Sequence, residues 1–119
     1  ITPRGLRQLM TVGPLGGRKW LMRANDGRVG VFDEAECAFA SDPDMIPLPK
    51  GAKDILYAGT TGLFLVTMPR ALRLWNFTRN TFSEVAGYRE GFIQRCWVHG
   101  KSVYCDCDHR IAVLTNVLP

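Results

Sequence analysis

The stretch VGVFD at residues 29–33 returns as LRLWN at residues 72–76 and again as IAVLT at residues 111–115. Each copy reads apolar, small or polar, apolar, large apolar, and then a small polar residue. The copies begin 43 and 39 residues apart. A near-constant period of this length indicates a repeat architecture, in which each unit buries its faces against its neighbours.

The residues around these stretches read as short strands separated by turns. In the first copy, Asp26-Gly27 separates two apolar-rich runs, Lys19–Asn25 and Arg28–Asp33. Asp-Gly at such a place is a strong hairpin signal, because glycine takes a positive φ without steric cost. A short run at Cys37–Ser41 follows and is also compatible with a strand.

The second and third copies follow the same plan. The expected strands are Asp54–Ala58, Leu63–Met68, Ala71–Thr78 and Thr81–Ala86, and then Phe92–Val98, Ser102–Asp108 and Ile111–Thr115. The sequence therefore predicts an all-β fold of antiparallel four-stranded meander repeats. We expect one β-repeat domain, or part of one, over residues 1–119, with copies at about 6–49, 50–91 and 92–119.

The return strands resemble those of WD40-type β-propeller blades, which are four-stranded units of about this period. In that family the third strand typically ends in a large aromatic residue followed by Asp or a similar residue, as in Phe32-Asp33 and Trp75-Asn76. The third copy departs with Leu114-Thr115. The resemblance implies a non-enzymatic protein–protein interaction module or scaffold within a larger assembly.

Three blades do not close a ring, since propellers use about 4–8 blades. We therefore expect the chain to need a partner or flanking sequence to complete its fold. The expected partner is a protein or a peptide.

An alternative resemblance is to the polo-box family of antiparallel sheets. Residues 20–41 (WLMRANDGRVGVFDEAECAFAS) are similar to the opening of a polo box, and residues 99–116 (HGKSVYCDCDHRIAVLTN) to the start of a second one. This resemblance implies a peptide- or phosphopeptide-binding domain of a kinase-type protein at a kinetochore or centrosome. It requires a helix in Arg70–Ala86 and places a phosphate contact near His109.

Composition narrows the classes of partner and compartment. Apolar residues make up 46% and charged residues 22% of the chain, as in ordinary globular domains. The net charge of +4 comes from scattered basic residues, which does not indicate a nucleic-acid surface. No apolar run approaches the ~18 residues of a membrane span. The four cysteines form no secreted disulfide framework, so we expect an intracellular protein, nuclear or cytoplasmic.

The C-terminal cysteines form one candidate site. If Gly100-Lys101 is a two-residue turn, Val98 faces Val103 and Cys96 falls opposite Cys105. Cys105, Cys107 and His109 alternate, so they share a face of a strand. The cysteine pattern has three interpretations. The cysteines are buried β-compatible residues, or Cys96 and Cys105 form a disulfide, or Cys96, Cys105, Cys107 and His109 bind zinc. Of these we expect the buried cysteines, and hence neither a metal nor a cofactor.

Three arginines form the other candidate site. Arg28, Arg70 and Arg110 each precede the return strand of their copy. In a propeller those turns lie on one rim, where three guanidiniums would form a basic arc for carboxylates or phosphates. Together with His109, they are the predicted binding residues.

No catalytic residue is predicted, and we expect no enzyme. Nucleophile, P-loop and zinc-protease motifs do not occur. Gly13–Gly17 lacks the Lys-Ser/Thr of a phosphate-binding loop and is expected to be a flexible turn. Trp20, Trp75 and Trp97 are expected in the core.

Overall fold

The computed structural model describes residues 9–24, 28–35, 38–39, 46–47, 51–85, 92–108 and 110–119. The described residues form β-strands joined by turns, and none of them lies in a helix. A helix long and apolar enough to cross a membrane is accordingly not found among them. The prediction of an all-β, antiparallel chain is confirmed.

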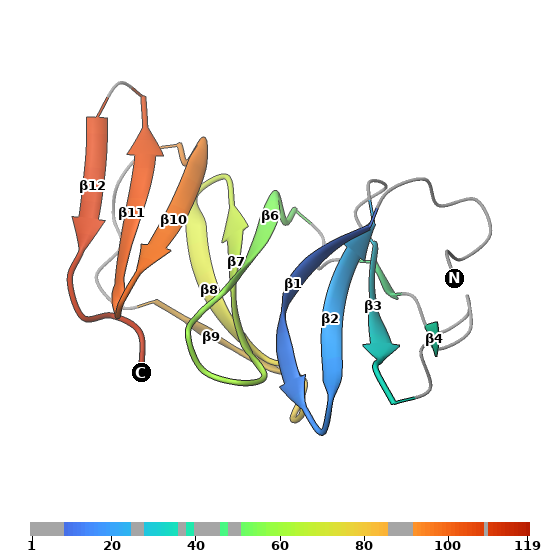
Figure 1. The fold of residues 1–119 in the computed structure, drawn as a ribbon. Helices are drawn as coiled ribbons and strands as arrows, with labels where there is room; N and C mark the ends of the chain where they lie inside the picture. The colour runs from blue at the N-terminus through green and yellow to red at the C-terminus, as the bar shows by residue number, and fades with distance from the viewer. Residues whose placement is uncertain are drawn as a thin grey trace. The chain divides into compact units, whose positions relative to one another are not determined.

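The chain divides into two compact units, Ile1–Lys50 and Gly51–Pro119. The first unit holds one sheet, here called sheet A, and the second holds sheets B and C (Figure 1). The strands of sheets A, B and C lie inside the residue ranges predicted for the first, second and third copies. None of the three sheets of described strands closes into a barrel.

Sheet A is an antiparallel meander whose last position is shared by two short strands. β3 pairs with β2 on one side and with both β4 and β5 on the other. The Asp26-Gly27 turn and Cys37 lie outside the described residues. The strands are β1 (Leu9–Gly16), β2 (Lys19–Ala24), β3 (Arg28–Asp33), β4 (Ala38–Phe39) and β5 (Ile46–Pro47).

β1 corrects one prediction, because Gly13–Gly16 belongs to a strand rather than to a flexible turn. The strand tolerates Pro14 because the register with β2 shifts between Pro14 and Gly16, and proline is accepted at such bulges. The turn that follows is only Gly17-Arg18, both with positive φ near 60°. Two positive φ values in a two-residue loop suit the twist of a hairpin.

Sheet B is the predicted four-stranded meander, in the order β6-β7-β8-β9. Its second and third strands pair from Leu63↔Asn76 to Met68↔Ala71, with Pro69-Arg70 as the turn. Residues 70–85 form that turn, β8, a second turn and β9. The polo-box interpretation therefore lacks the helix that it requires there. The strands are β6 (Asp54–Tyr57), β7 (Leu63–Met68), β8 (Ala71–Asn76) and β9 (Thr81–Glu84).

Sheet C has three described strands, in the order β10-β11-β12. They are β10 (Arg95–His99), β11 (Ser102–Cys107) and β12 (Arg110–Leu114). Apart from Thr115, which follows β12, the three return stretches of the sequence lie in β3, β8 and β12. Each of these is the third strand of its sheet.

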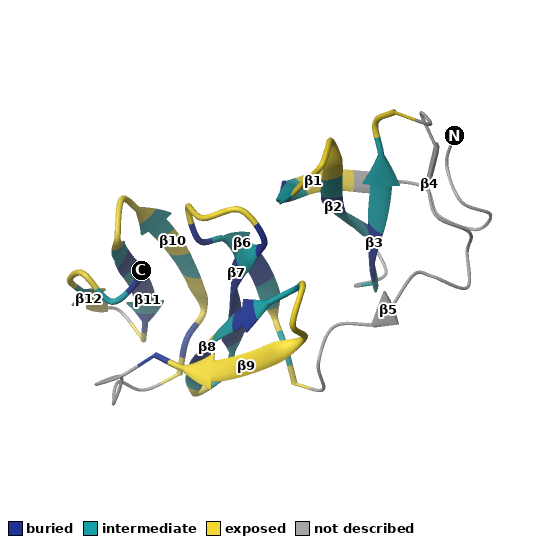
Figure 2. Ribbon diagram, turned by 90° about the horizontal axis from the view of Figure 1, so that it is seen from below, coloured by how far each residue is buried: buried dark blue, intermediate teal, exposed yellow. Residues whose placement is uncertain are grey.

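The core of the second unit lies between sheets B and C. Leu65 and Leu72 of sheet B belong to one buried cluster with Val103, Cys105 and Cys107 of sheet C. The alternation of β11 explains this, since Val103, Cys105 and Cys107 are buried while the residues between them are half-buried. Figure 2 shows the opposite extreme in β9, which is exposed along its length.

The other face of sheet B carries a row of aromatic side chains across all four strands. Tyr57 pairs with Phe64, Phe64 with Trp75, and Trp75 with Phe82. The Trp75 and Phe82 rings stack at 5.8 Å between centroids. Trp75 is buried, and its Nε1 donates a hydrogen bond to Asn80 Oδ1 at 3.1 Å. The prediction of Trp75 as a core residue is confirmed.

Candidate functional site

The β10–β11 hairpin carries the residues that stand out chemically. Its register runs from Arg95↔Asp106 through Cys96↔Cys105 to His99↔Ser102. Gly100-Lys101 is the two-residue turn, and Gly100 has a φ of 60°. A turn of this kind takes glycine at its first central position. The predicted pairing of Cys96 with Cys105 is confirmed.

The hairpin has an inner and an outer face. Cys96 and Val98 point to the side of the core cluster, where Cys105 is fully buried. Because neighbouring residues of a strand point to opposite faces, Trp97 lies on the outer face. Its side chain is 44% exposed, so the prediction of Trp97 as core is wrong.

The outer face carries large apolar side chains although it is open, and polar ones lie beside them, with Asp106 between Arg95 and Ile111 and His99 opposite Ser102. Trp97 pairs with Tyr104, and Tyr104 with Val113, which makes one row across the three strands. Val113 and Ile111 are 52% and 54% exposed. These residues, together with Arg95, are called the outer face of sheet C. The guanidinium of Arg95 lies over the Trp97 ring at 5.1 Å from its centroid.

The thiols of Cys96 and Cys105 form a close pair. Cys96 Sγ donates a hydrogen bond to Cys105 Sγ at 2.7 Å. This hydrogen bond, and then burial, raise the pKa of Cys96 far above its ordinary value. The same hydrogen bond, opposed by burial, lowers the pKa of Cys105. The two sulfurs therefore hold one proton more tightly, and the other less tightly, than two separate thiols would.

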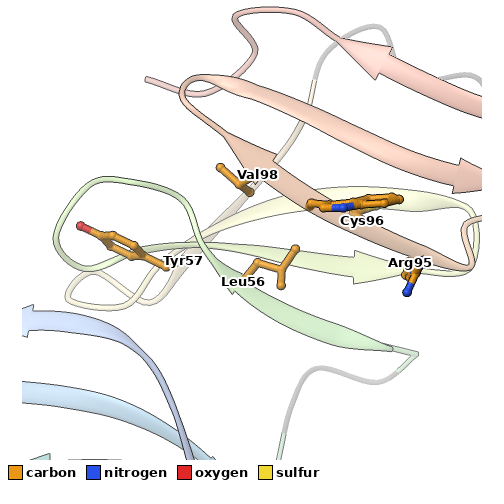
Figure 3. Close-up of a pocket in the computed structure, with 6 residues that line it drawn as sticks. Leu56, Tyr57, Arg95, Cys96 and Val98 are labelled. Atoms are coloured by element: carbon orange, nitrogen blue, oxygen red, sulfur yellow. The ribbon is translucent and has the colours of Figure 1, made fainter.

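A groove runs beside this pair, between β6 and β10. It has a volume of about 390 Å³ and is lined by Leu56 and Tyr57 of β6 and by residues 95–98 of β10 (Figure 3). Cys96 is among the lining residues, whereas Cys105 is not. The partly exposed Cys96 thus borders the groove, and the buried Cys105 does not.

The zinc hypothesis finds no cluster among the described residues. No three of their His, Cys, Asp and Glu side chains come close enough together to hold a metal ion. Cys96 and Cys105 are adjacent, and Cys107 lies two residues further along β11 on the same face. The fourth candidate, His109, lies outside the described residues.

The three arginines of the predicted arc belong to different units. Arg28 begins β3 in the first unit, and Arg70 and Arg110 lie in the second unit, in the β7–β8 turn and at the start of β12. β7 and β11 point the same way in Figure 1, so Arg70 and Arg110, which follow these strands, lie at the same end of sheets B and C. Arg70 stacks on Phe92 at 4.7 Å from the ring centroid.

The outer face of sheet C is the feature that sequence reasoning missed. The signal was present, since the turn that places Cys96 opposite Cys105 also places Trp97 opposite Tyr104. The expectation of buried Cys96 and Cys105 puts Trp97 on the opposite face of β10, which conflicts with the expectation of Trp97 in the core.

No protein-family model matches this chain, and no curated protein matches its sequence.

Proposed function

We propose that this chain is a non-enzymatic protein–protein interaction module, a scaffold piece that docks another protein on the outer face of sheet C. The observation that carries the proposal is the exposure of Trp97, Ile111 and Val113 on that one face. Interface cores are enriched in Trp, Tyr and Arg, and the outer face combines all three with branched aliphatic side chains.

The contrast between the two faces of sheet C supports the proposal. The inner face is buried against sheet B through Val103, Cys105 and Cys107. The outer face has comparable apolar character in Trp97 and Val113 but is accessible to solvent. Neighbouring exposed apolar side chains with polar residues beside them are a feature of protein interaction sites.

The proposed architecture is a set of blade-like meanders, of the kind found in WD40-type propellers. The four-stranded order of sheet B and its face-to-face packing with sheet C support it. In such an arrangement the outer face of sheet C is where a further sheet packs, here supplied by the partner protein. The expected occupant is therefore a β-sheet with an apolar face.

A site-specific photo-crosslinker tests this proposal. The crosslinking amino acid is placed at Val113 on the outer face, and in a matched control at Ser83 of the exposed strand β9. Both variants are produced in cells of the source organism and irradiated. We expect a discrete protein adduct from position 113 and none from position 83. The same adducts from both positions, or none from position 113, would refute docking on the outer face.

A further inference from the structure

Cys96 and Cys105 meet the geometric requirements of a cross-strand disulfide. They face each other directly in an antiparallel pair. Counting from the hydrogen-bonded pair that closes the two-residue turn, Cys96↔Cys105 is a pair without backbone hydrogen bonds. Cα atoms of such pairs lie ~4.5 Å apart, inside the ~4.4–6.8 Å range of disulfides.

The two sulfurs need little movement to bond. Their separation is 2.7 Å. An S–S bond is ~2.05 Å long, so each sulfur has to shift by only about 0.3 Å. The cysteine nearest to either of them along the chain, Cys107, has no such position, because it pairs with Arg110 rather than with a thiol.

An oxidant can reach one member of the pair. Cys96 is partly exposed and lines the groove between β6 and β10, whereas Cys105 is fully buried behind it. In this arrangement Cys96 is the thiol that an oxidant modifies first, and Cys105 is the resolving thiol that then forms the disulfide. The buried Cys105 is protected from solvent and lies close enough to bond.

We propose that Cys96 and Cys105 form a reversible disulfide when a peroxide oxidises the protein. The disulfide would link β10 to β11 covalently, under the control of the redox conditions. The proposal stands independently of the docking function, because it concerns the inner face of the sheet.

The chemistry balances in two steps. In the first, the Cys96 sulfur attacks hydrogen peroxide, and an S–O bond forms as the O–O bond breaks. The Cys96 proton passes along the hydrogen bond to Cys105, and the proton that Cys105 carried is released to the leaving hydroxide, which becomes water. In the second, the Cys105 sulfur attacks the sulfur of the Cys96 sulfenic acid, so that the S–S bond forms and the S–O bond breaks. The displaced hydroxide takes the Cys105 thiol proton and leaves as a second water. Overall, two thiols and one peroxide give one disulfide and two waters.

Reversal uses a dithiol reductant. One of its thiolates attacks the disulfide to give a mixed disulfide, and its second thiol then closes the reductant's own ring. The two electrons and two protons return to Cys96 and Cys105, which restores the reduced hairpin.

The experiment uses the 119-residue chain, reduced and then freed of reductant in the presence of a metal chelator. Hydrogen peroxide is added at equimolar amount, and free thiols are alkylated afterwards under denaturing conditions. We expect a monomer lighter by the mass of two hydrogen atoms, with Cys96 and Cys105 unalkylated and recovered as one linked peptide pair. A dithiol reductant is expected to restore alkylation of both.

Matched variants separate this pair from the other cysteines. Cys107→Ser is expected to form the same disulfide, and Cys96→Ser to lose it and to leave Cys105 alkylated. A link through Cys107 or Cys37, a disulfide only between molecules, or oxidation that the dithiol does not reverse would each overturn the proposal. Because the main readout is on the unmodified protein, failure of a variant to fold leaves the test intact.

Discussion

Replacing Val103 and Val113 by alanine probes the two faces of sheet C with the same chemical change. Val103 is fully buried in the cluster between sheets B and C, whereas Val113 is 52% exposed on the outer face. Each substitution removes two methyl groups. At Val103 the lost transfer free energy is about 1.6 kcal/mol, at ~0.8 kcal/mol per carbon group.

The cavity left at Val103 adds to that loss. Core structure relaxes only partly around a removed group, which contributes about 1 kcal/mol more. We therefore expect Val103→Ala to lower the free energy of unfolding by about 2–3 kcal/mol. Val113→Ala should change it by no more than about 0.5 kcal/mol, as at other exposed positions.

Urea denaturation followed by circular dichroism measures both values, with the slope on denaturant checked for equality between variants. The comparison decides whether the inner face of sheet C is the packed one. Equal losses at the two positions would refute the reasoning, because they would mean that the outer face is covered as fully as the inner face. A negligible loss at Val103 would refute the packing of sheet C on sheet B.

Other predictions concern single contacts. Asn80→Gly removes the hydrogen bond to Trp75, and glycine adopts the left-handed backbone at φ 51° without strain. Thermal unfolding should show a free energy of unfolding lower by about 1 kcal/mol. Asn80→Ala should lower it by about 1 kcal/mol more, because alanine is strained at that φ. Cys96→Ala removes the hydrogen bond that lowers the pKa of Cys105 and leaves burial, which raises it. The pKa of Cys105 should therefore rise. Ultraviolet titration of the thiolate, with the other two cysteines replaced by serine, measures the direction of the change. Oxidation of Cys96 and Cys105 should raise the free energy of unfolding by up to about 2.7 kcal/mol, since the disulfide closes a loop of roughly ten residues. Denaturation curves recorded with and without dithiol measure this difference, and coincident curves would contradict the prediction.

Local turn chemistry made the C-terminal hairpin predictable. The prediction assumed a two-residue turn at Gly100-Lys101, and a turn of that length sets the register of both strands. That is why Cys96↔Cys105 and Val98↔Val103 follow from the sequence. The same reasoning gave the limits of β7 and β8 around Pro69-Arg70.

The strand β1 and the exposure of Trp97 were not predicted, each for a physical reason. β1 contains Gly13, Pro14 and Gly16, which are poor strand formers, and it exists because β2 offers a pairing edge and bulges absorb the misfit. Trp97 was expected inside because large aromatic residues usually are, but the register of the hairpin had already assigned the inner face to the cysteines.

The sequence by itself determined the all-β class, the approximate limits of most strands in the second unit, and the third-strand position of the repeated stretches. These depend on turn residues and on alternation, which are local properties. Only the tertiary structure decided which face of sheet C is covered, that Cys96 lines a groove while Cys105 is buried, and that the two sulfurs come within 2.7 Å. Alternation separates two faces of a strand but does not say which of them another sheet will cover, because that depends on contacts between residues far apart in the chain.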